Sequence, residues 1–299
     1  MDSYYNLEKT FKNYLPEVLL FDEFKSVKSA DGHMSFHLCN GLTGQTIDIV
    51  EDKKLLSLIR YFGRYSHNAI KRVKYIVIDM YSPYISLIKK IFPNALIIIY
   101  TFHIIQLISR TLNKTRIMIM KNDKVNYNKL KRYWRFLLKS RDELNYEKWK
   151  KYTCFNKFIT ESDVVNYIIN TNIELKNTYD VYQSLLSSIK NKNYNLFIRI
   201  LNNHSDNISS YMKTSIKTLN EFKDKIKNTF NNNYHNGYIE GNNNFIKFIK
   251  RIAFGFRSFI RFKIRILICK NLLKIKKTNN GVSVIRLNNY HLFCVTHTI

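Results

Sequence analysis

Short apolar stretches separated by turn sequences dominate the first fifty residues. Residues 17–27, 34–43 and 43–52 are rich in apolar and aromatic side chains, and SADGH supplies a turn between the first two. Three strands in succession with tight turns predict an antiparallel meander. In residues 53–66 the apolar positions change to helical spacing, which predicts a helix after the third strand.

Two continuous apolar runs follow, at residues 74–80 and 95–100, and each has the length of a buried strand. The segment between them opens on Ser82 and Pro83 and closes at Pro93, so we expect a helix over 82–92 with Ser82 as its cap. Strands that alternate with helices are typically parallel. The order of elements therefore predicts an α/β fold, a ribonuclease-H-like mixed sheet with flanking helices.

The rest of the chain has helical periodicity. Residues 104–230 alternate apolar and Lys/Asn-rich stretches with no convincing strand, the Asn-rich segment at 231–237 predicts a loop, and 238–256 resumes an amphipathic helix. We expect an all-helical insertion domain within the ribonuclease-H-like fold. The predicted divisions are 1–122 for the first part of the ribonuclease-H-like domain, 123–230 for the helical insertion, 231–275 for the final helices of that domain and 276–299 for an unassigned tail.

The chain is strongly basic, with 49 Lys and Arg against 22 Asp and Glu and a net charge of +27. This balance favours a polyanionic partner, with nucleic acid ahead of a membrane surface. An AT-rich genome would also raise the lysine count, although it does not explain why Lys so outnumbers Glu. The four cysteines form no C-x-x-C pair, so we expect reduced, buried thiols rather than a zinc ribbon or disulfides. The N-terminus lacks a signal peptide and the apolar runs are too short to span a bilayer, so we expect a cytoplasmic protein.

Carboxylates stand at the ends of predicted strands. Asp22 lies in the first strand and Asp79, 57 residues later, ends the fourth. If these strands are neighbours, as the ribonuclease-H-like order requires, the two acids converge on one point and need a cation between them. Mg²⁺ takes oxygen ligands, and a pair of such ions can assist phosphodiester chemistry. Pairing of Asp22 with nearby lysines, and capping of the next helix by Asp79, are the alternative interpretations.

Glu240 is the best candidate for a third carboxylate. On a helix it shares one face with Asn244, Lys247 and Arg251, while an apolar stripe on another face can pack on the sheet. That polar face could run from a metal ligand to phosphate contacts. A plain solvated helix is an equally good interpretation of the spacing. His103, among apolar residues, is by default a hydrogen-bonded core histidine.

Several of these segments together resemble the catalytic region of bacterial insertion-sequence transposases of the ISL-three family. The segments are FDEFKS, KYIVIDMYSPY, FPNALIIIYTFHIIQ, LNKTR and NGYIEGNNNFIKFIKRIAFGFRSFIRFKIRIL, and they fall between about residues 15 and 122 and between 234 and 275. Ordered motifs of this kind are more specific than any single motif. The resemblance implies an acidic-triad (DDE) transposase of the ribonuclease-H-like fold that cuts and joins DNA with Mg²⁺.

Carried over by residue, the resemblance places the triad on Asp22, Asp79 and Glu240, with two Mg²⁺ ions for which Mn²⁺ could substitute. Basic residues on or after the last helix would hold DNA phosphates, and we assign this role to Lys247, Lys250, Arg251, Arg257 and Arg261. The implied partner is double-stranded DNA, at transposon ends and target sites. We expect a homodimer or larger assembly on that DNA, no membrane partner, and association with the bacterial nucleoid.

The sequence departs from the family pattern at three places. Tyr100 stands where the family has an Asp near His103, and Asn242 and Phe245 replace an apolar residue and a Lys. The family's N-terminal zinc-binding and helix-turn-helix region has no counterpart here, which suggests a truncated form. We assign Tyr100 and His103 to supporting positions around the site. The alternatives are an inactive transposon remnant that only binds DNA and a structure-selective nuclease on the same fold.

Overall fold

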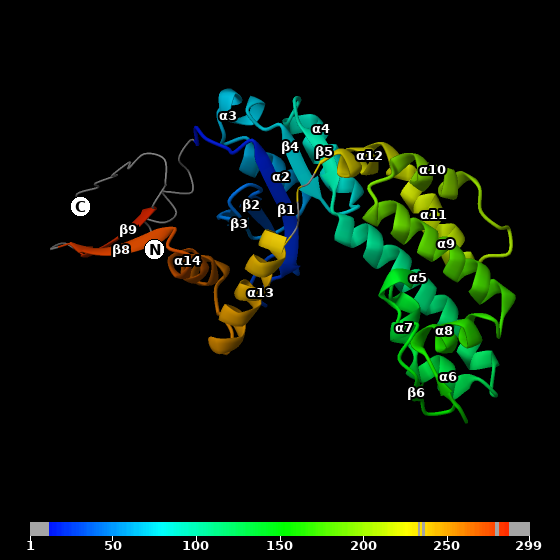
Figure 1. Ribbon diagram of the computed structural model, residues 1–299. Helices are drawn as coiled ribbons and strands as arrows, with labels where there is room; N and C mark the ends of the chain where they lie inside the picture. The colour runs from blue at the N-terminus through cyan, green and yellow to red at the C-terminus, as the bar shows by residue number, and fades with distance from the viewer. Residues whose placement is uncertain (1–11, 233, 235–236, 279–280, 287–299) are drawn as a thin grey trace. The chain divides into compact units, whose positions relative to one another are not determined.

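The computed structural model describes residues 12–232, 234, 237–278 and 281–286 (Figure 1). The chain divides into two compact units, one formed by residues up to 98 and from 234 onward, the other by residues 99–233. Residues 101–122, which the sequence analysis placed in the first part of the catalytic domain, form a helix within the second unit. The functional division of the chain into catalytic and insertion domains stays a prediction.

A five-stranded mixed sheet is the centre of the first unit. The strand order is β3-β2-β1-β4-β5, with β1–β2 and β2–β3 antiparallel and β1–β4 parallel. This meander followed by a parallel neighbour is the arrangement that the apolar pattern predicts, and it is compatible with a ribonuclease-H-like fold. The strands are β1 (Val18–Lys25), β2 (Met34–Asn40), β3 (Thr46–Val50), β4 (Tyr75–Ile78) and β5 (Leu96–Ile99).

One face of this sheet packs against helices through aromatic rings. Phe21 of β1 lies 5.6 Å from Phe62 and 6.2 Å from Tyr84 between ring centroids. The helices of this part of the chain are α2 (Leu55–Phe62), α3 (His67–Lys71) and α4 (Ser82–Ile91). The sequence analysis missed α3, a single short helix. Its choice of Ser82 as the cap of α4 is wrong, because Tyr81 occupies the N-cap without a side-chain hydrogen bond.

The other face of the sheet packs against α13 (Gly237–Ile252) and α14 (Phe259–Cys269). Phe24 joins Ile246, Ile249 and Phe262 in one buried apolar cluster, because strand side chains alternate between faces and Phe24 therefore points away from Phe21's side. A buried ion pair, Lys263 Nζ to Asp48 Oδ1 at 2.9 Å, adds a polar link between α14 and β3. These contacts hold α13 over β1.

The second unit is helical apart from one two-stranded ribbon with two residues in each strand. That ribbon is the only departure from the expected all-helical insertion in this part of the described chain. The helices are α5 (Thr101–Asn122), α6 (Tyr127–Arg132), α7 (Trp134–Leu138), η1 (Arg141–Glu143), α8 (Glu161–Ile169), α9 (Ile173–Lys190), α10 (Tyr194–Asn202), α11 (Ser210–Glu221) and α12 (Lys223–Asn231), and the ribbon is β6 (Lys150–Lys151) with β7 (Phe158–Ile159).

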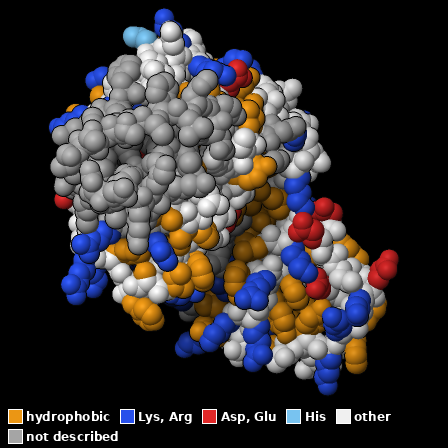
Figure 2. Space-filling view, turned by 90° about the vertical axis from the view of Figure 1, so that its left-hand side faces the viewer, with side chains coloured by type: hydrophobic (Ala, Val, Ile, Leu, Met, Phe, Trp, Pro, Cys, Tyr) orange, Lys and Arg blue, Asp and Glu red, His pale blue; other side chains and the backbone are white. Residues whose placement is uncertain are grey.

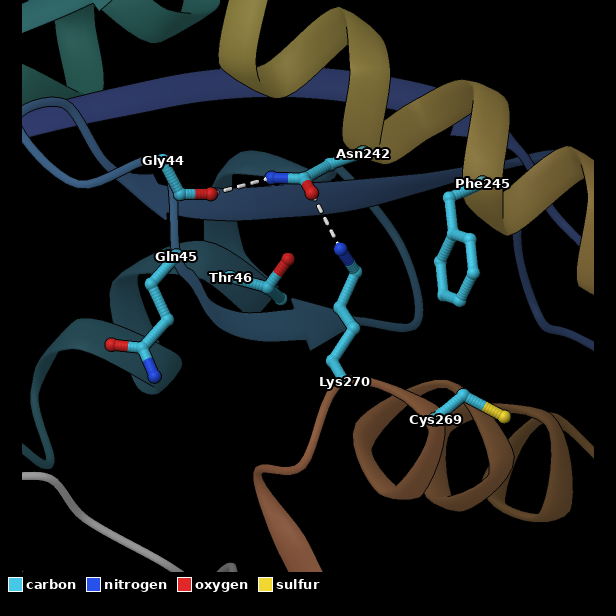
Figure 3. A pocket seen from close by; sticks show the side chains of 7 residues that line it. All are labelled: Gly44, Gln45, Thr46, Asn242, Phe245, Cys269 and Lys270. Atoms are coloured by element: carbon cyan, nitrogen blue, oxygen red, sulfur yellow. Dashed lines mark hydrogen bonds between the residues drawn. The ribbon is translucent and has the colours of Figure 1, made fainter.

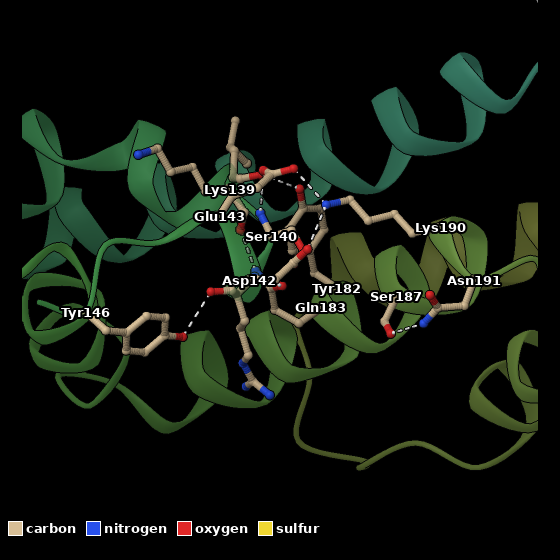
Figure 4. A network of polar contacts seen from close by, with 12 residues as sticks. Lys139, Ser140, Asp142, Glu143, Tyr146, Tyr182, Gln183, Ser187, Lys190 and Asn191 are labelled. Atoms are coloured by element: carbon tan, nitrogen blue, oxygen red, sulfur yellow. Dashed lines mark hydrogen bonds and ion pairs between the residues drawn. The ribbon is translucent and has the colours of Figure 1, made fainter.

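A polar network ties the middle of this unit together (Figure 4). Lys190 at the end of α9 donates to Glu143 at 2.7 Å, and the Gln183 amide donates to the Lys139 carbonyl at 2.8 Å and accepts from the backbone N–H of Arg141 at 3.1 Å. Backbone groups in the turn around η1 are thereby paired by side chains of α9. The network fixes this turn against α9.

A hairpin of β8 (Leu273–Thr278) and β9 (Gly281–Arg286) follows α14, in the segment that the sequence analysis left unassigned. Lys and Arg side chains are spread over the surface shown in Figure 2 rather than gathered at one spot. Among the described residues, no helix combines the length and apolar composition that crossing a bilayer requires. Cys39 is buried, but Cys154 and Cys269 are exposed, so the expectation of buried thiols is wrong for these two; Cys294 lies outside the described residues.

Candidate active site

Asp22 lies within β1, two residues past its last pair with the parallel strand β4, and Asp79 directly follows β4. In the β1–β4 ladder Val18 pairs with Tyr75 and Leu20 with Val77, a constant offset of 57 residues. The same offset separates Asp22 from Asp79, so the register continued by two residues sets them opposite each other. Both side chains accept the N–H of the next residue, at 2.8 Å for Asp22 and 2.5 Å for Asp79. The structure thus brings these two predicted site residues together.

The electrostatic environment of Asp22 disfavours its charge. Burial raises the pKa of this carboxyl from 3.8 to about 6; the Glu23 backbone N–H lowers it, and the negative charges of Glu23 and Asp79 raise it again. Lys247 is the cation that opposes this effect, and its side chain is exposed. A buried carboxyl with a second acid beside it is a suitable environment for a bound cation.

A buried amide and a buried imidazole orient Asp22. Asn243 of α13 donates its Nδ2 to Asp22 Oδ2 at 2.7 Å, and its Oδ1 lies 2.7 Å from His37 Nδ1. With Nδ2 committed to the carboxylate, Asn243 Oδ1 accepts, and His37 Nδ1 carries the proton. His37 Nε2 then accepts from the Thr46 hydroxyl at 3.0 Å. Burial lowers the pKa of His37 to about 4, so the ring is neutral at pH 7.

This chain of contacts was not predicted from the sequence. His37 pairs with Asp22 across the antiparallel β1–β2 ladder, so the two side chains share a face of the sheet. Asn243 follows Glu240 by three residues and so lies on the same side of the helix. These two spacings were the available signals, but neither shows that α13 crosses the sheet at this point.

Glu240 lies in the first turn of α13, and its side chain is exposed. In the part of the chain that the structure describes, no three His, Cys, Asp or Glu side chains are placed to hold a metal ion together. Glu240 is therefore not gathered with the two aspartates in this structure, and its role as a third ligand stays a prediction.

The start of α13 is seated on the β2–β3 turn. Gly44 there has a φ of +71°, and a Cβ at this position would lie 2.6 Å from the Tyr238 ring, so glycine is required on both counts. The Gly44 carbonyl also accepts from Asn242 Nδ2 at 2.7 Å. The backbone around Glu240 is thereby held close to the edge of the sheet.

A pocket of about 450 Å³ opens beside this seat (Figure 3). Asn242 and Phe245, two positions that depart from the family pattern, both line it, and Lys270 of the α14 end points between them. The Lys270 ammonium donates to Asn242 Oδ1 and lies 4.9 Å from the centroid of the Phe245 ring. Burial lowers the pKa of Lys270. The two departures thus contact one lysine rather than lying at unrelated sites.

The predicted phosphate-binding residues differ in their availability. Lys247, Arg251, Arg257 and Arg261 are exposed. Lys250 is partly buried and donates to the carbonyls of residues 25 and 26, at 2.9 Å in each case. Lys250 therefore pairs with backbone carbonyls at the end of β1, and its ammonium is less available for binding a phosphate than those of the other four basic residues.

Tyr100 and His103 belong to the second unit. Tyr100 is buried at the N-cap of α5, its carbonyl accepts the His103 N–H at 3.0 Å, and the two rings lie 5.7 Å apart between centroids. This is the environment of a packed histidine. Their predicted supporting role around the acids stays a prediction.

Comparison with known proteins identifies the family. Residues 19–266, a span that includes Asp22, Asp79 and Glu240, match the DDE family of ISL-three transposases, described as transposase. A Lactococcus lactis subsp. lactis protein named as an ATP-dependent protease is 38% identical over 110 residues, which make up 37% of this chain and 35% of that protein. The chain thus spans about a third of that relative's length. On the family match, which covers most of its residues, the chain belongs to the ISL-three family of DDE transposases.

Proposed function

We propose that this chain is the catalytic region of a DNA transposase that cleaves DNA strands and transfers them with the help of bound Mg²⁺. Its partners are double-stranded transposon ends and target DNA, on which it acts as a dimer or larger assembly. Family membership supports the reaction class. The in-register pair of Asp22 and Asp79 is the observation that carries the site.

The donor set fits a divalent ion. Asp22 and Asp79 offer carboxylate oxygens, the ligands that Mg²⁺ prefers. Burial, with the negative charges of Glu23 and Asp79, raises the pKa of Asp22, and a bound cation would offset this effect. DDE transposases generally use divalent metal ions, and two such ions supply activation of an attacking oxygen and stabilisation of a leaving oxygen. Asp22, Asp79 and Glu240 would hold them.

The chain's own residues prepare this site. Asn243 fixes the direction of the Asp22 carboxylate, and neutral His37 fixes the Asn243 amide without adding charge. Because the carboxylate is already oriented by its hydrogen bonds, little conformational entropy remains to be lost when it binds a cation. Lys247, exposed and close enough to influence Asp22, is positioned to contact a phosphate entering the site.

A second candidate function is DNA binding without cleavage. It is favoured by the exposure of Glu240 and by the absence, in the described residues, of a cluster of three metal-binding groups. Glu240 precedes Asn243, which contacts Asp22, by about one helical turn, so whether Glu240 joins the acids decides between the two candidates.

Metal binding and strand cleavage test the proposal. Mn²⁺ is titrated calorimetrically into the full chain with and without duplex DNA, and nicking of supercoiled plasmid is followed in Mg²⁺. The variants are Asp22→Asn, Asp79→Asn and Glu240→Gln, and Asp31→Asn, an exposed turn residue, is the matched control. We expect the first two variants to lose metal binding and nicking and the control to keep both.

Glu240→Gln separates the candidates. Loss of nicking with DNA binding retained supports the three-acid site. If the folded wild-type chain binds duplex DNA but neither binds Mn²⁺ nor nicks plasmid, the proposal of catalysis fails and the DNA-binding candidate replaces it.

A further inference from the structure

The turn that follows α13 presents one aromatic side chain to solvent. Phe254 is 101% exposed, the highest exposure among the large apolar side chains of the described residues. Its backbone has a φ of +51°, and Gly255 follows at +111°. A non-glycine residue in the left-handed region costs conformational free energy, and Phe254 recovers none of that cost through packing.

Two more large apolar side chains are exposed on α13 itself. Phe248 and Ile252, one turn apart on α13, are 53% and 51% exposed, whereas Phe245 and Phe256 pack against the buried cluster. The helix therefore has enough aromatic residues to cover its core contact and still presents others outward. Three exposed large apolar side chains within seven residues of one helix and the turn after it favour a contact with a partner.

The charge around these side chains has one sign. Lys247, Arg251 and Arg257 flank them and are exposed, and residues 241–299 contain twelve Lys and Arg and no Asp or Glu. Two copies of this basic end of α13 would repel each other. A partner must present anions at its surface and apolar area between them, and a DNA duplex does so with its phosphates and its stacked bases.

We propose that Phe254 is a wedge that inserts between base steps of duplex DNA while Lys247, Arg251 and Arg257 hold the flanking phosphates. The wedge rests on the proposed function in that DNA is the partner, and the position of the kink rests in addition on the acids as the cleavage site. Apolar side chains that enter a base step unstack it and kink the duplex by about 20–90°. The tight turn, with its N–H groups bonded back to α13, holds the ring at the helix end instead of on a long loop.

The helix sets where the distortion should occur. From Glu240 to Ile252 α13 measures about 18 Å, at 1.5 Å per residue. That length equals about five base pairs of B-form DNA. We therefore place the kinked step within about six base pairs of the phosphodiester that the acids would act on, close enough to bend the strand toward the site.

DNA bending without cleavage tests the wedge. Energy transfer is measured across a duplex of about 30 base pairs with dyes at its two ends, in EDTA so that no strand is cut. The full chain is compared with Phe254→Gly, Phe254→Leu and the matched control Phe158→Ala, an exposed phenylalanine of the second unit. Glycine adopts positive φ without penalty, so Phe254→Gly should fold at least as stably as the wild type.

The wedge predicts that Phe254→Gly abolishes the bend and weakens duplex binding about tenfold, the scale of one lost stacking contact. Phe254→Leu should keep part of the bend, and Phe158→Ala should keep all of it. A stable Phe254→Gly variant that bends DNA like the wild type overturns the proposal.

Two further outcomes are informative. The same variants are tested on phosphatidylserine vesicles, because a basic, aromatic tip also suits an anionic membrane. If Phe254→Gly loses vesicle binding but bends DNA like the wild type, the partner of Phe254 is a membrane rather than DNA, and the wedge proposal is overturned. Bending that needs Phe254 in a chain that never nicks DNA in Mg²⁺ supports the wedge and refutes only the catalytic proposal. Absence of any DNA binding by the wild type overturns both.

Discussion

Replacing Asp22 by asparagine should stabilise the metal-free protein while removing its proposed activity. The folded-state pKa of Asp22, about 6, lies above the ordinary value of 3.8, so the fold binds this proton more tightly than the unfolded chain does. This group therefore favours folding below about pH 4, and the stability falls as pH rises through the interval from 4 to 6. Above that interval the ionised carboxylate costs the fold about 3 kcal/mol, at 1.36 kcal/mol per pKa unit.

Asparagine removes the charge and keeps the shape. Asp22 accepts hydrogen bonds from the Glu23 N–H and from Asn243, and a single amide oxygen serves both less well. If the Asn243 amide group rotates by half a turn, its oxygen accepts from the amide introduced at position 22 and its nitrogen donates to His37 Nδ1. Neutral His37 then carries its proton on Nε2 and donates to Thr46. Allowing about 1 kcal/mol for imperfect hydrogen bonding, we expect a net gain of about 2 kcal/mol at neutral pH.

The assay must report on the first unit. Trp134 and Trp149 are the chain's two tryptophans, and both lie in the second unit, so their fluorescence does not follow Asp22. Amide hydrogen exchange in β1 and β2, measured in EDTA, does. At about pH 7.5 the slowest amides of Asp22→Asn should exchange more than tenfold more slowly than those of the wild type, since 1.4 kcal/mol is a factor of ten.

The pH dependence decides whether the reasoning holds. The difference between wild type and variant should shrink as the pH falls through 6 toward 4, because the wild-type carboxyl is then protonated. Adding Mn²⁺ should stabilise the wild type and leave Asp22→Asn unchanged. Equal or faster exchange in the variant at neutral pH, or a difference that ignores pH, would refute the view that Asp22 is held ionised at a cost. Asp31→Asn, on an exposed turn, serves as the control.

Three other predictions follow from the same contacts. Asp48→Ala should destabilise the first unit by about 3–5 kcal/mol, measured by the same exchange experiment, because it leaves Lys263, only 3% exposed, without its carboxylate. Lys247→Gln should reduce the slope of log affinity for duplex DNA against log salt by about 0.9. Lys250→Gln should change that slope less and lower the stability of the first unit, because the Lys250 ammonium donates to two carbonyls. Equal slopes for the two variants would contradict their different placement. Gly44→Ala should destabilise the start of α13 by about 1–3 kcal/mol, seen as faster exchange of its first amides, because the left-handed backbone and the Tyr238 ring both exclude a Cβ.

The sequence alone predicted the mixed sheet, and it predicted the convergence of two acids on the condition that the first and fourth strands are neighbours. Continuous apolar runs at 74–80 and 95–100 have the length of buried strands, and the Gly- and Asn-containing turns between the first three segments favour hairpins. Because parallel strands pair at a constant offset, the 57 residues between Asp22 and Asp79 already matched the register that the fold adopts. Local periodicity indicates that each strand exists and is buried, whereas the order of strands and helices along the chain is what favoured the first and fourth strands as parallel neighbours.

Only the tertiary structure decided what surrounds those acids. The hydrogen bonds from Asn243 to Asp22 and to His37 join residues 221 and 206 positions apart, and no local pattern specifies which polar groups of a helix meet which strand. The exposure of Phe254 was equally hidden, because Phe245, Phe254 and Phe256 look alike in sequence and differ only in whether the sheet lies beneath them. Side-chain periodicity determines that a helix has an apolar face, whereas the crossing of that helix over the sheet determines which residues remain outside it.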